Sequence, residues 1–90
     1  MIFSSNRSGG YGGNDIYISF RKTDGTWTKA INLGPEINNN DMQLWPYVSP
    51  DGKFLFYINL EDRGNGEVYW LDAGILRDLR SQTSAPDYEP

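Results

Sequence analysis

Alternating apolar and polar residues divide this chain into short strands separated by turns rich in glycine, asparagine and aspartate. The clearest case is residues 44–58, where two apolar runs flank the turn Ser49-Pro50-Asp51-Gly52. Asp51 and Gly52 suit the positive φ angles of a short hairpin loop, and the run that follows favours a strand. The pattern therefore predicts a β-hairpin. Pro46 has no backbone donor, which places the first strand at a sheet edge or inner rim.

Apolar runs predict four further strands, at residues 2–5, 15–20, 27–33 and 67–71. The second and fourth of these carry apolar side chains on both faces, so each needs cover on both sides. Residues 8–14 are rich in glycine but precede a strand and lack the Lys-Ser/Thr of a phosphate-binding loop, which predicts a flexible hairpin loop. Residues 74–80 fit either a short amphipathic helix or a final outer strand.

The two halves of the chain repeat. Leu55-Phe56 matches Ile2-Phe3, and residues 67–70 match residues 15–18, at an offset of 52 to 53 residues. Units of three or four short antiparallel strands at this period are typical of β-propeller blades. A blade that lies between two neighbours also explains strands that are apolar on both faces.

The chain resembles the TolB-like, WD-type β-propeller repeats over roughly residues 2–72. The resemblance rests on Ser49-Pro50-Asp51-Gly52, Phe3-Ser4-Ser5-Asn6-Arg7, residues 9–17, Trp27, Asn32-Leu33-Gly34 and Ile37-Asn38. It implies four-stranded blades in a closed ring, used most often to bind proteins or ligands and sometimes as a non-catalytic partner domain of an enzyme. Proteins of this family are often periplasmic or secreted.

We therefore expect an all-β chain with about two antiparallel propeller blades. Residues 1–40 would form a first blade without its innermost strand, and residues 41–82 a second blade. Residues 83–90 would form a tail that is extended or donates a strand to a neighbour. Two blades cannot close a ring, so homo-oligomerisation is expected to complete it, with a trimer favoured over a tetramer or a dimer.

Composition narrows the function classes. The chain has no Cys and no His, and its 8 Lys and Arg against 12 Asp and Glu give a net charge of −4. Disulfides, thiolate zinc sites and imidazole catalysis are therefore excluded, and a nucleic acid partner is not expected. No apolar run is long enough to span a membrane, and the start does not resemble a signal peptide. As written, the chain is expected in the cytoplasm.

Carboxylates are the remaining candidates for acid–base chemistry. Asp15 and Glu67 occupy equivalent positions just before a strand, which suggests a shared structural role such as accepting loop N–H bonds. Asp51 and Asp24 are turn residues of Asp-Gly pairs. No spacing in the sequence predicts the carboxylate pair of a glycosidase, whose members stand about 5 to 9.5 Å apart. We expect no enzymatic activity and no cofactor.

Two groups of side chains could meet a ligand. Glu36 and residues 38–41 gather oxygen atoms, but their spacing is not that of a calcium loop, so a solvated connection is favoured over a calcium site. Within it, Asn39, Asn40 and Asp41 are the candidate ligand-facing loop. The tryptophans could form a sugar-stacking platform, although so small a core needs most aromatic rings for packing. Two hypotheses follow. The chain is a non-enzymatic propeller module that binds a protein or ligand, or a fragment of a larger propeller enzyme or carbohydrate-binding protein.

Overall fold

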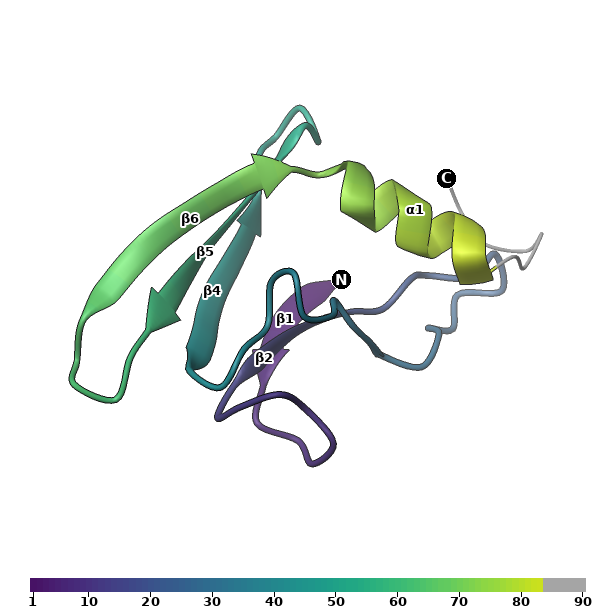
Figure 1. Ribbon diagram of the computed structural model, residues 1–90. Coiled ribbons are helices and arrows are strands. Elements are labelled where there is room, and N and C mark those ends of the chain that lie inside the picture. Colours follow the sequence, from purple (N-terminus) through teal and green to yellow (C-terminus); the bar gives the residue numbers. More distant parts are fainter. Residues whose placement is uncertain (84–90) are drawn as a thin grey trace.

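The computed structural model describes residues 1–83, which fold into two three-stranded antiparallel sheets and one helix (Figure 1). The first sheet has the order β1-β2-β3 and the second β4-β5-β6. The elements are β1 (Ile2–Ser5), β2 (Asp15–Ile18), β3 (Ile31–Asn32), β4 (Met42–Val48), β5 (Phe54–Leu60), β6 (Gly66–Asp72) and α1 (Gly74–Thr83). The expected all-β chain is thus confirmed as a mostly β fold, with the helix as the exception.

The hairpin predicted around Ser49–Gly52 is confirmed as β4 and β5. β4 lies at an edge of its sheet, where the missing donor of Pro46 costs no ladder bond. The pairing register shifts between Leu44 and Tyr47, and Trp45 has a φ of 51°. Pro46 is therefore accommodated in a β-bulge, which bends the strand and leaves residues unpaired.

Two predictions for the outer segments need correction. The strand predicted over residues 27–33 contracts to Ile31–Asn32, because Thr28 is held against the end of β2. The Thr28 amide donates to the Phe20 carbonyl at 2.8 Å, and the Phe20 amide donates to Thr28 Oγ1 at 2.9 Å. Of the two alternatives for residues 74–80, the helix is observed. Of the tail predicted over residues 83–90 to be extended or to donate a strand, Thr83 ends the helix and the remainder lies outside the described residues.

The helix forms because its start is capped and one side of it is apolar. Asp72 Oδ1 accepts a hydrogen bond from the Gly74 amide at 2.7 Å, as a capping side chain does at a helix N-terminus. Ile75, Leu76 and Leu79 pack against the hydrophobic core. Figure 1 shows α1 following directly on β6 and extending away from the second sheet. In residues 1–83 this helix is the only one, and it is too short and too polar to cross a membrane.

The core lies between the sheets and under the helix. Ile16 and Ile18 of β2 share one buried cluster with Leu55 and Tyr57 of β5. Both β1 and β2 contact β4, and Ser4 Oγ donates to the Gln43 carbonyl at 2.7 Å. Phe20, Leu33 and Ile37 complete the buried cluster. One face of each sheet is therefore packed against the other sheet in the core.

The hairpins β1–β2 and β5–β6 carry similar aromatic pairs. Phe3 lies opposite Tyr17, and Tyr57 lies opposite Tyr69. The ring centroids are 6.0 Å and 5.7 Å apart, with interplanar angles of 18° and 19°. When Glu67 is matched with Asp15, as the sequence suggests, the register matches Tyr57 with Phe3. The match between β1 and β5 is therefore shifted by one residue: Ile2-Phe3 corresponds to Phe56-Tyr57, and not to Leu55-Phe56 as expected.

Candidate functional site

The second sheet presents an apolar face that the described chain does not bury. Alternation along β5 and β6 directs six apolar side chains to this side, which we call the open face: Phe54, Phe56, Ile58, Leu60, Val68 and Trp70. Val68 and Trp70 are 67% and 65% exposed. Phe54, Phe56 and Trp70 line a shallow hollow of about 250 Å³, and the Phe54 and Trp70 rings meet edge to face at 5.5 Å. Exposed apolar patches of this kind mark interaction surfaces.

The side of the first sheet that faces away from the second sheet is covered by its own chain. We call this side, which carries Phe3, Asp15 and Tyr17, the loop face, because the loop 6–14 folds over it. A Cβ atom added at Gly10 would collide with the Asp15 carboxylate and approach the Tyr17 hydroxyl. One added at Gly12 would collide with the backbone of residues 39–41. These glycines allow the loop that joins β1 and β2 to pack closely against Asp15 and residues 39–41.

Arg7 completes the cover of the loop face. Its guanidinium carbon lies 5.2 Å from the Phe3 ring centroid and 4.9 Å from that of Tyr17. Arg7 Nε also donates to Ser5 Oγ at 3.0 Å, which fixes the side chain over the rings. Cations held over aromatic faces in this way are attracted by the ring quadrupole. Arg7 itself stays exposed, so the loop face presents a cation to its surroundings.

Asp15 and Glu67 have different environments although they match in sequence. Asp15 is 1% exposed, and its Oδ2 accepts bonds from the Tyr11 amide at 2.6 Å and from Asn32 Nδ2 at 3.0 Å. Its Oδ1 is buried without a hydrogen-bond partner among residues 1–83. Glu67 is exposed and accepts a bond from the Tyr69 hydroxyl at 3.0 Å, an interaction that raises the pKa of Tyr69. Asp15 thus accepts the expected hydrogen bond from a loop amide. The Glu67 carboxylate instead accepts a hydrogen bond from the Tyr69 hydroxyl.

The predicted ligand-facing loop Asn39-Asn40-Asp41 is committed largely to internal bonds. Asn39 Oδ1 accepts from the Asp41 amide at 2.8 Å and from Gln43 Nε2 at 2.7 Å. Asp41 Oδ2 accepts from Asn59 Nδ2 at 3.1 Å. Asn40 is exposed. We call Asn39, Asp41, Gln43 and Asn59 the amide cluster, and it ties the loop to β4 and β5.

Sequence reasoning missed Gln43 and the structural role of Asn38, and both residues are almost fully buried. Gln43 is 0% exposed, and its Nε2 also donates to Asn59 Oδ1 at 2.7 Å. Asn38 is 1% exposed and pairs with the backbone of Ile16: its Oδ1 accepts from the amide at 2.8 Å, and its Nδ2 donates to the carbonyl at 3.0 Å. The side chain thus acts as a neighbouring strand would. Gln43 and Asn59 face each other across β4 and β5 in apolar runs, a signal that could have revealed the cluster.

The three tryptophans are exposed. Trp27, Trp45 and Trp70 have exposures of 49%, 71% and 65%, against the expectation that most aromatic rings serve core packing. Trp45 lies on the bulge of β4, and its φ of 51° is unusual for a residue other than glycine. Strained backbone that carries an exposed ring is typical of binding positions.

Both Asp-Gly turns are held by their carboxylates, as expected for turn residues. Asp51 Oδ1 accepts from Ser49 Oγ at 2.6 Å and from the Lys53 amide at 3.0 Å, and these bonds lower the pKa of Asp51. Asp24 Oδ1 accepts from the Thr26 hydroxyl and amide, which lower its pKa in the same way. Gly52 has a φ of 73°. The Ser49–Gly52 turn is therefore accounted for by structure alone.

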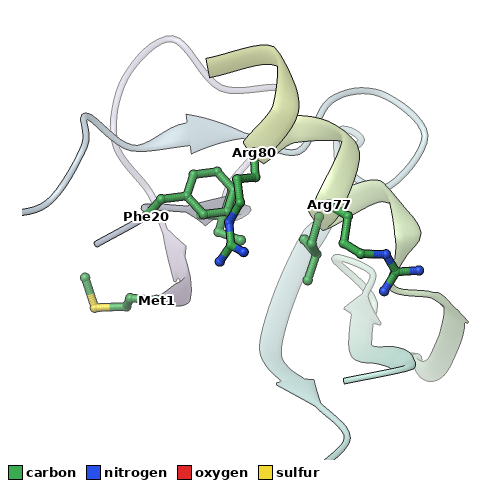
Figure 2. A pocket seen from close by; sticks show the side chains of 6 residues that line it. Met1, Phe20, Arg77 and Arg80 are labelled. Atoms are coloured by element: carbon green, nitrogen blue, oxygen red, sulfur yellow. The ribbon is translucent and has the colours of Figure 1, made fainter. Parts of the chain in front are cut away.

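A second hollow, of about 190 Å³, lies between the helix and the first sheet (Figure 2). Its lining is apolar at Ile18, Phe20 and Leu76, and Arg77 and Arg80 stand at its edge. The Arg80 guanidinium carbon lies 5.4 Å from the Phe20 ring centroid, and Figure 2 shows the two side chains next to each other. Arg77 is paired with Asp72 at 3.6 Å. The arginines are therefore engaged with the chain itself.

Residues 1–83 contain no group of three or more Asp, Glu, Cys or His side chains placed to hold a metal ion. Comparison with protein-family models found no matching family, and comparisons with curated proteins and with solved structures found no match either. The site must therefore be interpreted from its own chemistry. That chemistry is an exposed aromatic and aliphatic face on the second sheet, and a face of the first sheet that carries an exposed cation, Arg7.

Proposed function

We propose that the chain is a non-enzymatic binding module of the β-propeller type, in which copies of the chain associate to complete the ring. The observation that carries this proposal is the open face, where Val68 and Trp70 remain 67% and 65% exposed. Burying such side chains stabilises an assembly by roughly 25 cal/mol per Å² of apolar area. A specific interface buries about 800 Å² per partner.

The arrangement of the sheets supports the propeller interpretation. The sheets pack with the Ile16–Ile18 side of the first against the Leu55–Tyr57 side of the second. Ile16 and Ile18 match Val68 and Trp70 of the open face, so the matched faces of the two sheets point the same way, and the open face points away from the interface between them. Blades in a propeller also stack front to back. Two such sheets in one chain would make a six-bladed ring from a trimer and an eight-bladed ring from a tetramer.

The mass of the protein in solution tests this proposal. Multi-angle light scattering over a hundredfold range of concentration should show an assembly of several chains of 10.2 kDa each, with three copies favoured. The matched variants are Trp70→Glu on the open face and Trp27→Glu, whose ring is exposed elsewhere. Only Trp70→Glu should reduce the mass. A single-chain mass for the unmodified protein at every concentration would overturn the proposal.

Trp45 favours a second candidate, a carbohydrate-binding protein. Its ring is 71% exposed on a bulge with a φ of 51°, and flat aromatic faces stack well on sugar rings. A glycan array followed by titration tests this candidate. A true sugar site would lose affinity on Trp45→Ala and keep it on Trp27→Ala. An array without binding at millimolar sugar would remove this candidate and leave the first one standing.

A further inference from the structure

We infer that the open face of one copy docks on the loop face of the next copy, head to tail. This inference rests on the proposed function and names the partner surface that self-association would use. The occupant of the open face is thus a second copy of this chain, and the surface it presents is the loop 6–14 with the exposed Arg7. The interface is heterologous, because two different surfaces meet.

The chain itself shows how such a face is covered. Ile16 and Ile18 are 0% and 6% exposed because the second sheet packs over them, whereas the matched Val68 and Trp70 are 67% and 65% exposed. Along the chain, β2 is followed by a sheet that covers its apolar side. Among residues 1–83, β6 is followed by α1, which packs on the core shared with the first sheet. In the proposed arrangement, the sheet that covers β6 in the same way belongs to another copy.

The loop face has the chemistry to meet the open face. The side of the second sheet that packs inside the chain carries the stacked pair Tyr57–Tyr69, and the loop face carries the matched pair Phe3–Tyr17. Arg7 lies on the outer side of that pair and is exposed. Aromatic rings such as Trp70 and Phe54 are good partners for a guanidinium group. If instead the open faces of two copies packed against each other, Arg7 would not contact the aromatic rings of the open face.

Mixing two interface variants tests the head-to-tail arrangement. Trp70→Glu disables the open face and Arg7→Glu disables the loop face, so each variant alone should associate about a hundredfold more weakly because a carboxylate would be buried unpaired. An equimolar mixture still offers one intact pair of surfaces. Native mass spectrometry, which separates the variants by mass, should then find a dimer with one chain of each kind. Trp27→Glu serves as the matched control and should assemble like the unmodified protein.

The outcomes separate this inference from the proposed function. If Trp70→Glu dissociates the assembly while Arg7→Glu leaves it intact, the head-to-tail arrangement is overturned and self-association stands. The same holds if the mixed dimer is absent. Circular dichroism checks that Arg7→Glu folds, and if it does not, Arg7→Gln replaces it with an expected weakening of about tenfold. An unmodified protein that remains a single chain contradicts the proposed function itself.

Discussion

The hairpins β1–β2 and β5–β6 pair their strands alike but treat their outer faces differently. In the first, the loop 6–14 folds back over Asp15 and Tyr17. In the second, the loop 61–65 closes on itself through bonds of 2.9 Å from the Glu61 amide to the Asn65 carbonyl and from the Gly64 amide to the Glu61 carbonyl. It does not cover the matched residues Glu67 and Tyr69, which stay exposed. The loop therefore decides whether the face that carries Asp15 or its match Glu67 is covered, and the opposite face depends on whether a second sheet packs on it.

The largest expected effect comes from adding one methyl group to each loop. Gly12→Ala should lower the free energy of unfolding by about 3 kcal/mol, because the new Cβ would collide with rigid backbone of residues 39–41. Gly66→Ala, next to the other loop, should change it by less than about 0.5 kcal/mol, since its Cβ meets Leu60 and Ile58 at ordinary contact distance. Urea denaturation measures both. Equal effects would mean that the first loop is not packed as described.

Asn38 gives the next largest effect. Asn38→Ala should destabilise the fold by about 2 kcal/mol, because the buried amide and carbonyl of Ile16 would lose their partner. The exposed Asn65 in the second hairpin's loop provides the control, and Asn65→Ala should cost less than about 0.5 kcal/mol. Thermal denaturation of the two variants compares them directly. A neutral Asn38→Ala would show that Ile16 finds another partner.

Each loop also carries one arginine, which allows a third comparison. Arg7→Ala should cost about 1 kcal/mol, because the Phe3 and Tyr17 rings lose the guanidinium that covers them. Arg63→Ala, at an exposed position in the second loop, should cost less than about 0.5 kcal/mol. The expected order is read from chemical denaturation midpoints. The comparison fails if Arg63 proves to be the more important of the two.

The smallest effect is a dependence on pH at the turn before β5. Hydrogen bonds from Ser49 and Lys53 lower the pKa of Asp51 in the folded chain. Its contribution is therefore present above the unfolded pKa of about 3.9 and is lost as the pH falls through the lower folded pKa. Asp51→Asn should flatten the stability profile below about pH 4, which acid titration followed by circular dichroism detects. An unchanged profile would show that the turn does not depend on the charge.

The parts of the fold that follow from local patterns could be predicted from the sequence. Strand alternation, the Asp51-Gly52 turn and the edge position of Pro46 depend on residues close together in the chain. The extent of β3 could not be predicted, because the contacts of Thr28 with Phe20 decide it. The helix could not be chosen over a strand either, since its apolar side finds the core only in three dimensions.

The candidate site was less accessible to prediction for the same reason. Glycine runs signal loops, but only the structure shows that Gly10 and Gly12 lie against Asp15 and residues 39–41. The polar loop Asn39-Asn40-Asp41 suggested a ligand surface, yet bonds to Gln43 and Asn59 from other strands engage it. Apolar residues on both faces of a strand predicted cover on both sides. For β6, we propose that a second copy of the chain covers the side that carries Val68 and Trp70.

The accessibility of Trp70 tests most directly the claim that the open face is covered by a second copy. Replacing Trp27 and Trp45 by phenylalanine leaves Trp70 as the only tryptophan, and acrylamide quenching then reports its exposure alone. The account predicts strong quenching at high dilution and at least about threefold weaker quenching once the protein associates, as expected for a ring at the centre of an interface. Quenching that stays equally strong at every concentration, in a protein whose mass has increased, would contradict it.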